Sequence, residues 1–244
     1  MLVLLLKEIR SFFSSLIAYI VIIVFLIING LFLWVFPGQF NILEAGYANL
    51  DSLFFLAPWI FLFLVPAITM RLFSEERRLG TIELLLTKPL SDIQLVIAKY
   101  FAGVILVILS LLPTLIYYIT VYLLGNPPGN LDAGGFWGSY IGLFFLAAVY
   151  TAIGLYASSL TENQIISLII AILISFFFYI GFDSISLLNL PKGIDNFIIQ
   201  LGINDHYKSI SRGVVDTRDI IYFLTVIILF ILLTKLKLES RKWK

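Results

Sequence analysis

Long stretches without any Asp, Glu, Lys or Arg constrain this chain more than any other feature. The stretches are Ser11–Leu43, Ser52–Met70, Tyr100–Leu131, Ala133–Thr161, Asn163–Phe182 and Ile220–Thr234. Crossing the bilayer core of roughly 30 Å takes about 20 apolar residues in a helix. The first five stretches are long enough to cross the bilayer by themselves. The last needs one more helical turn, which would include the flanking Asp219 and Lys235. We therefore predict six membrane-crossing helices.

Helices are favoured over a transmembrane barrel because the apolar runs do not alternate with polar residues, as barrel strands do. Only 13% of the residues are charged, against about 25% in soluble domains. The sequence thus predicts an all-α membrane protein, with one transmembrane domain over residues 1–244. The predicted spans cover approximately residues 14–36, 53–72, 98–124, 136–159, 164–184 and 218–236.

The distribution of basic residues predicts the orientation of the chain. Segments on the side of the N-terminus hold Lys7, Arg10, Arg71, Arg77, Arg78, Lys88, Lys99, Lys235, Lys237, Arg241, Lys242 and Lys244. The opposite segments hold only Lys192, Lys208, Arg212 and Arg218. Since cytoplasmic loops carry the excess of Lys and Arg, we expect a bacterial inner-membrane protein with both termini in the cytoplasm.

Three segments outside the spans carry further expectations. Residues 1–13 predict a short interfacial helix with Lys7 and Arg10 reaching toward headgroups. Thr161, with Gln164 three residues later, has a capping-box pattern for the fifth span. Between the fifth and sixth spans, apolar residues from Ile194 to Leu201 recur at helical spacing and predict an external helical segment.

The sequence lacks the residues that most catalytic and ion-coupled carrier mechanisms require. The span centres contain no charged residue, which argues against an ion-coupled carrier. The phosphate-binding G-x-x-x-x-G-K-[ST] motif is absent, so we expect no ATP site of that kind in this chain. His206 is interpreted as an exposed loop residue, and cysteine is absent. A net charge of +1 gives no indication of nucleic-acid binding.

The loop between the second and third spans is the most informative segment. The second span is expected to continue as a charged helix to about Arg78 and to end at Gly80, since glycine accepts the left-handed conformation. Thr81 can cap a second short helix that Pro89 terminates, and Ser91 has a capping-box pattern for the third span.

Three successive leucines in that short helix, Leu84 to Leu86, point in different directions around its axis. They cannot all face one membrane surface, so at least one is expected to enter a pocket of a cytoplasmic partner. The alternative interpretation is an interfacial helix that lies on the headgroups.

At these residues the chain resembles the ABC-2 type transporter permeases. Their first cytoplasmic loop reads like E-[ER]-x-x-G-T-[LIM]-E-x-L-[LM]-x-x-P, and Glu76 to Pro89 fits this pattern throughout. The segment Ser158–Gln164 is similar to an inner hairpin of the family. Within the family, Arg212–Asp219 makes the chain most similar to the gliding-motility-associated permease subunit, and permeases for nitrous-oxide-reductase maturation are also similar.

The resemblance implies a separate ABC ATPase, which would bind ATP and magnesium, so no cofactor is expected in this chain. It also implies two six-helix halves, formed with a second membrane subunit bearing a periplasmic domain or as a homodimer. The residues implied in ATPase coupling are Glu75, Glu76, Arg77, Arg78, Gly80, Thr81, Glu83, Leu84, Leu85 and Pro89.

Two functions remain open from the sequence. In the first, this non-catalytic subunit is the permease of an ABC transporter that exports or extrudes a substrate, in a gliding-motility-associated system. In the second, it is a non-transporting membrane anchor that relays ATPase strokes to a periplasmic machine. A continuous cavity between the two halves would distinguish the transporter from the anchor.

Overall fold

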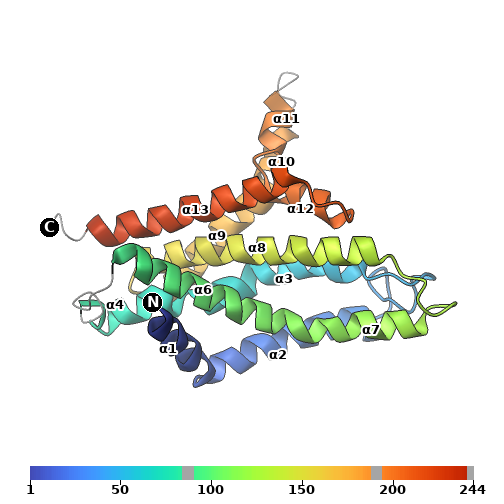
Figure 1. Cartoon of the computed structure of the whole chain (residues 1–244), viewed down its shortest axis with the longest axis horizontal. Coiled ribbons are helices and arrows are strands. Elements are labelled where there is room, and N and C mark those ends of the chain that lie inside the picture. The colour runs from blue at the N-terminus through green and yellow to red at the C-terminus, as the bar shows by residue number, and fades with distance from the viewer. Residues whose placement is uncertain (84–90, 188–193, 241–244) are drawn as a thin grey trace.

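We describe the chain from a computed structural model that defines residues 1–83, 91–187 and 194–240. These residues form helices joined by turns and loops (Figure 1). The elements are α1 (Leu2–Phe13), α2 (Leu16–Gly30), η1 (Leu31–Val35), α3 (Asp51–Thr69), α4 (Arg71–Arg78), α6 (Asp92–Leu111), η2 (Leu112–Thr114), α7 (Leu115–Leu124), α8 (Ala133–Leu160), α9 (Gln164–Phe176), η3 (Phe177–Gly181), α10 (Phe182–Ser186), α11 (Ile194–Ile199), α12 (Ile203–Ser211) and α13 (Thr217–Glu239).

Six helical units are long and apolar enough to cross a membrane. They are Ala18–Val35, Asp51–Arg78, Asp92–Leu124, Ala133–Leu160, Gln164–Ser186 and Thr217–Glu239. The prediction of an all-helical chain with six membrane-crossing helices is therefore confirmed for the described residues. The second unit continues past the approximate span end at residue 72 to Arg78, as predicted for its charged extension. The third starts at Asp92, directly after the predicted capping residue Ser91 and ahead of the approximate span start at residue 98.

The bundle has two distinct ends (Figure 1). The N-terminus, α4 and the last turn of α13 lie toward one end, here called the terminal end. The loops of residues 36–50 and 125–132 lie toward the other, here called the loop end. The second and third units are therefore extended at the terminal end.

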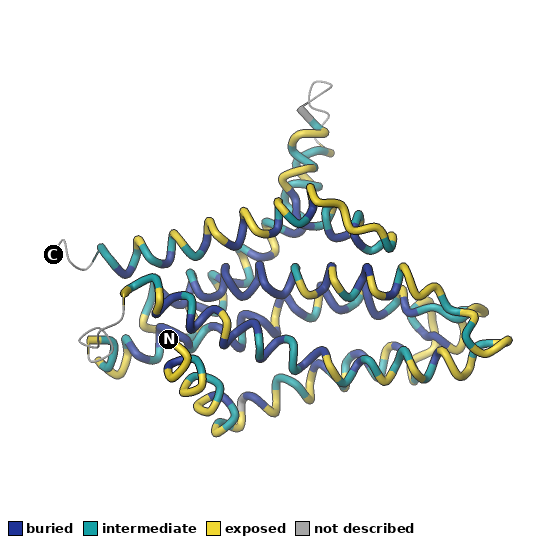
Figure 2. Tube along the Cα trace, viewed as in Figure 1, coloured by how far each residue is buried: buried dark blue, intermediate teal, exposed yellow. Residues whose placement is uncertain are grey.

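The helix α8 forms the centre of the bundle. Of the 18 residues in its most apolar stretch, 78% are buried, compared with 22% for the corresponding stretches of the first and fifth units. Figure 2 shows α8 buried along most of its length. It packs against α3, α9, α12 and α13. Gly154 permits part of this contact, because a Cβ there would lie 1.9 Å from the hydroxyl oxygen of Thr69. Small residues allow membrane helices to approach closely, so α3 and α8 can pack tightly at the centre of the bundle.

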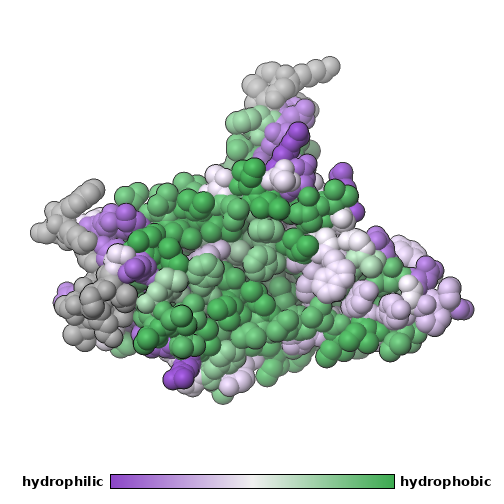
Figure 3. All heavy atoms as spheres, in the orientation of Figure 1, coloured by the Kyte–Doolittle hydropathy of each residue, from purple (hydrophilic) through white to green (hydrophobic). Residues whose placement is uncertain are grey.

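The outer surface is apolar along the middle of the bundle and more polar toward its ends (Figure 3). Ile23, Leu173 and Leu224, on α2, α9 and α13, are each about half exposed or more. Such exposure is unfavourable in water, at about 25 cal/mol per Å², but carries no such cost against lipid tails. The surface therefore agrees with the six membrane-crossing helices.

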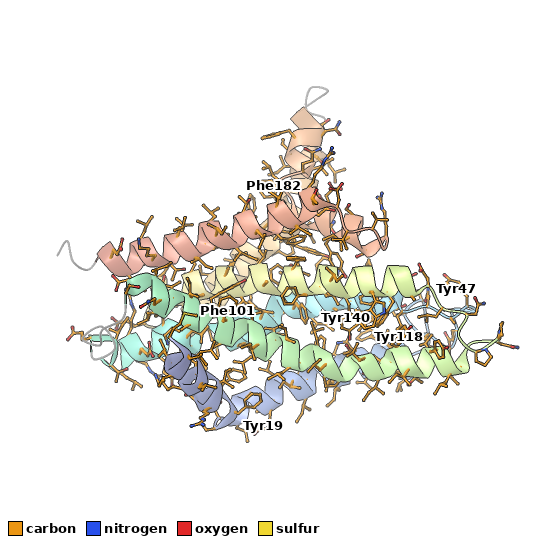
Figure 4. The ribbon with its side chains drawn as sticks, in the orientation of Figure 1. Tyr19, Tyr47, Phe101, Tyr118, Tyr140 and Phe182 are labelled. Carbon is orange, nitrogen blue, oxygen red and sulfur yellow. The ribbon has the colours of Figure 1, made fainter. Side chains whose placement is uncertain are left out.

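Aromatic side chains gather at the loop end, between α7 and α8. The ring centroid of Phe136 lies 4.3 Å from that of Tyr118 and 5.0 Å from that of Tyr140 (Figure 4). The Tyr140 hydroxyl is hydrogen-bonded to Thr114. Phe136 is buried, so the cluster packs α7 against α8 at the loop end.

His206 is not the exposed loop residue that the sequence predicted. It lies on α12, and its side chain is 13% exposed. Its ring stacks on Tyr222 at 3.9 Å, and Nδ1 lies 2.7 Å from Oδ1 of Asp219. The prediction was wrong because the segment before the last span forms a helix that packs against α13, which the local sequence did not reveal.

The predicted cap of the fifth span was also wrong. Thr161 follows the end of α8, and Asn163 caps α9 instead, with its side-chain oxygen accepting a hydrogen bond from the Ile165 N–H at 2.9 Å. Thr161 supports the turn by accepting from the Asn163 N–H at 3.1 Å. Both residue types cap helices well, so composition alone could not choose between them.

The N-terminal helix exists as predicted, and its position at a bilayer interface remains a prediction. Leu4 and Phe12 are buried on α1, and the Glu8 side chain between them is only 11% exposed. These three residues are four apart and therefore share one face of the helix. That face packs on α6, so α1 is part of the bundle.

Candidate functional site

The helix that leaves the second membrane-crossing unit ends in a defined motif at the terminal end. Gly80 has a φ of +68°, a backbone conformation that residue types other than glycine disfavour. The Gly80 N–H donates to the Arg77 carbonyl at 3.1 Å, and the Thr81 N–H donates to the Glu76 carbonyl at 2.9 Å. This pair of bonds satisfies carbonyls that the helix end would leave free. The predicted helix stop at Gly80 is therefore confirmed.

The chain beyond Gly80 is described as far as Glu83, which is exposed. Leu84, Leu85 and Pro89 lie outside the described residues, so the short helix that contains them remains a prediction. The third unit begins as expected: the Gln94 N–H donates to the Ser91 hydroxyl, and the Ser91 N–H donates to the Gln94 side chain at 3.1 Å. This capping box fixes where α6 starts.

A buried lysine on α6 is the main electrostatic feature of this end. Lys99 has a side-chain exposure of 0%. Its Nζ lies 2.9 Å from Oε1 of Glu76 and 3.2 Å from Oε1 of Glu8, and it donates to the backbone carbonyl of Leu72. A lysine ammonium has three donors, and each has an acceptor here. A buried charge requires such compensation.

Lys7 completes the cluster of four charged residues. Its Nζ lies 3.3 Å from Oε1 of both Glu8 and Glu76. Burial alone lowers the pKa of Lys7, but the two carboxylates outweigh it and raise the pKa above its ordinary value. The ion cluster, defined as Lys7, Glu8, Glu76 and Lys99, thus joins α1, α4 and α6 at one point.

The ion cluster stabilises the fold only while each of its buried charges keeps its partners. Removing one partner of a buried ion pair typically costs about 3–5 kcal/mol, because the other charge is left without compensation. One carboxylate oxygen of Glu76 is already buried without a hydrogen-bond partner among the described residues. Displacing α4 relative to α1 or α6 would therefore carry a large electrostatic cost, so the three helices are expected to move together.

The residues implied in ATPase coupling divide into two groups. Glu76 is 9% exposed and belongs to the ion cluster. Glu75 pairs with Arg71 at 3.2 Å within α4, and Arg71 also donates to the Ser15 hydroxyl at 2.8 Å. By contrast, Arg78 and Glu83 are exposed.

The first group holds α4 to the bundle. The exposed residues, at the end of α4 and beyond it, are available to a partner. Arg77 is partly exposed, between these two groups.

Sequence reasoning did not single out Glu8 or Lys99, and it expected Lys7 to reach toward headgroups, whereas Lys7 pairs with Glu8 and Glu76. Lys99 directly precedes a charge-free stretch, so it has the sequence pattern of an ordinary interfacial lysine. Its burial depends on α1 folding back over α6, a long-range contact without a local signal. The pairing of Lys99 with Glu8 across the chain was therefore not predictable from spacing.

The ion cluster links three helices through paired charges. Among the described residues, no three His, Asp or Glu side chains are placed to hold a metal ion. The partly or fully buried charged residues Glu8, Arg71, Glu75, Glu76 and Lys99 are instead paired. The fold and the site together define a multi-pass helical membrane protein with a charged, helix-linking end.

Comparison with protein families then identifies the chain. Residues 2–236 match the model of the ABC-2 family transporter protein, so the chain belongs to this family. It is thus a transmembrane permease of an ABC transporter, a type of membrane subunit that is typically non-catalytic and works with an ABC ATPase. No curated protein matches the chain.

Proposed function

We propose that this chain couples ATP hydrolysis in a separate ATPase subunit to the export or extrusion of a substrate. ATP and magnesium would bind to that partner, with no cofactor held by this chain. The observation that carries the proposal is the ion cluster beneath an exposed loop. A force applied to the loop after Arg78 reaches three helices through one set of buried charges.

The coupling mechanism follows from the continuity of α3 and α4. Only Met70 separates these helices, and its backbone is helical, so the second unit transmits displacement along its axis. The predicted coupling helix begins near Glu83 and would seat its leucines in the ATPase. When the ATPase moves this helix, α4 carries α1 and α6 with it through Glu76. The membrane-crossing helices that follow, α3 and α6, then tilt together.

The terminal end would face the cytoplasm of a bacterial inner membrane, where the ATPase binds. Support comes from the basic residues of this end, since cytoplasmic segments carry the excess of Lys and Arg. A second six-helix half, from another copy or from a membrane subunit with a periplasmic domain, would complete the transporter. The half-exposed apolar faces of α2, α9 and α13 leave surface for such a partner. The segment Arg212–Asp219 supports a gliding-motility-associated system.

Charge reversal at Glu83 tests the docking site directly. In Glu83→Lys, the exposed loop carries a positive charge where the ATPase would bind a negative one. We expect at least about tenfold less ATPase bound per permease, equivalent to about 1.4 kcal/mol of binding free energy. The measurement is mass-spectrometric quantification of the ATPase after affinity purification from membranes. Membrane insertion should be unchanged because Glu83 is exposed.

The matched control is Asp205→Lys, an equally exposed acidic residue on α12, toward the loop end. It should retain the ATPase at the level of the unmodified chain. Normal ATPase binding by Glu83→Lys would refute docking at this loop.

A further inference from the structure

A pocket of about 370 Å³ opens between α3, η3, α8 and α12, toward the loop end. Its lining has two parts. Tyr179 and Tyr207 are nearly buried and form its floor, while Asp51 and Lys208 are exposed at its rim. Trp59, which is 38% exposed, forms one side. The pocket therefore combines an aromatic interior with a charged opening.

The walls of this pocket are held by hydrogen bonds between different helices. The Tyr207 hydroxyl donates to the Phe54 carbonyl at 2.7 Å, which joins α12 to α3. Burial raises the pKa of Tyr207 well above its ordinary value, so this hydroxyl stays protonated and able to donate. Asn204 donates to Asp183 at 2.6 Å, which joins α12 to α10. The pocket is thus a built feature of the fold.

The two charges at the rim have opposite signs and are not paired with each other. Lys208 forms no ion pair with any residue that the structure describes, and Asp51 is hydrogen-bonded only to the Asn49 amide there, at 2.7 Å. A cation on α12 and an anion on α3, both lining one pocket, match a ligand that carries both an anionic and a cationic group. The faces of Trp59 and Tyr179 can further stabilise a cation.

An apolar groove of about 540 Å³ adjoins the pocket at Trp59, which lines both. The groove runs between α2 and α3, and its lining residues are all apolar. On α2 and η1 it extends from Ile20 to Phe32, or about 18 Å at the helical rise of 1.5 Å per residue. Its shape and chemistry match a hydrocarbon chain. A headgroup pocket and a chain groove meeting at one tryptophan indicate one amphiphilic ligand.

We propose that the pocket and groove bind a zwitterionic phospholipid with an amine headgroup, its phosphate at Lys208, its amine at Asp51 and an acyl chain along α2 and α3. That this lipid class is the transported substrate rests on the proposed function above. The binding site itself does not depend on the ATPase.

Quenching of Trp59 fluorescence tests the proposal. The variant Trp34→Phe/Trp137→Phe/Trp243→Phe retains Trp59 alone, and the probe is phosphatidylethanolamine with brominated acyl chains, titrated into the detergent-solubilised chain. We expect saturable quenching. Asp51→Asn and Lys208→Gln should each weaken binding roughly tenfold, since each removes one charge-assisted contact.

Two comparisons sharpen this test. Asp205→Asn, on the same helix as Lys208 but outside the pocket lining, should bind like the parent. Brominated phosphatidylglycerol, which has no amine, should lose affinity in Lys208→Gln but not in Asp51→Asn. Quenching without saturation, or unchanged in both pocket variants, would show ordinary boundary lipid and overturn the proposal.

A second measurement covers the case in which the single-tryptophan variant does not fold. Native mass spectrometry of the unmodified chain should then retain one phosphatidylethanolamine, and Lys208→Gln should lose it. If lipid binding is lost while the ATPase remains bound, only the assignment of this lipid class as the substrate is refuted. A chain that binds the lipid but no ATPase would instead refute the proposed function.

Discussion

Lys99 shows what a single residue contributes to this fold. Its ammonium contacts acceptors on both α1 and α4, as that of Lys7 does, but the Lys99 side chain has no exposure to solvent whereas that of Lys7 is 54% exposed. The Lys99 ammonium donates hydrogen bonds to Glu8 and to the Leu72 carbonyl and forms an ion pair with Glu76. Because a buried ion pair is sensitive to the loss of one partner rather than of both, paired substitutions can isolate its role.

We predict that Lys99→Met destabilises the chain by about 3–5 kcal/mol, because Glu76 is left buried without its closest cation. Glu76→Gln should also destabilise it. The double variant should be more stable than the sum of the two effects implies, since both charges are then removed together. Reversible unfolding in mixed detergent micelles measures all three. Strict additivity would contradict a direct pairing of the two residues.

At the scale of the element, the position of α12 against α8 depends on glycine. A Cβ at Gly138 would lie 2.6 Å from the Ile210 carbonyl oxygen, so a side chain there would push α12 away. Gly134, one turn earlier, has its nearest such contact at 3.4 Å, with Asp132. Glycines four residues apart, such as Gly134 and Gly138, can let helices approach closely, and this pair lies at the start of α8. The structure shows that Gly138 makes the closer contact.

We predict that Gly138→Ala destabilises the chain by about 1–3 kcal/mol, as overpacking does elsewhere. It should also weaken phospholipid binding, because α12 carries Tyr207 and Lys208 into the pocket. Gly134→Ala is the matched control and should be close to neutral for both properties. Thermal unfolding in detergent and the Trp59 quenching titration provide the two measurements. Equal effects of the two substitutions would argue against this specific contact.

Local sequence patterns specified some elements and not others. Gly80 and the capping box at Ser91 were predictable because each depends on residues within a few positions along the chain. The helix around His206 was missed, since its formation depends on packing against α8 and α13. The same limit applies to Lys99. Chain-local signals gave the helix ends at Gly80 and Ser91, while tertiary contacts placed the ion cluster and the pocket beside Trp59.

At the scale of the whole molecule, the two ends of the bundle have different roles in this account. The terminal end links three helices through buried charges and presents an exposed loop. The loop end holds an aromatic cluster and, near it, the pocket with its rim charges. The second unit extends from Asp51 at the pocket to Arg78 at the exposed loop, so a single helical path joins the two sites. Motion imposed at the loop can thereby alter the pocket.

The central claim is that this permease works with an ATPase bound at the terminal end. The most direct measurement is to purify the tagged chain from its native membranes in mild detergent and to identify its stoichiometric companions by mass spectrometry. The account predicts an ABC ATPase in a fixed ratio to the chain, together with a second membrane half. A chain that emerges alone, or only with copies of itself, would contradict ATPase-driven coupling.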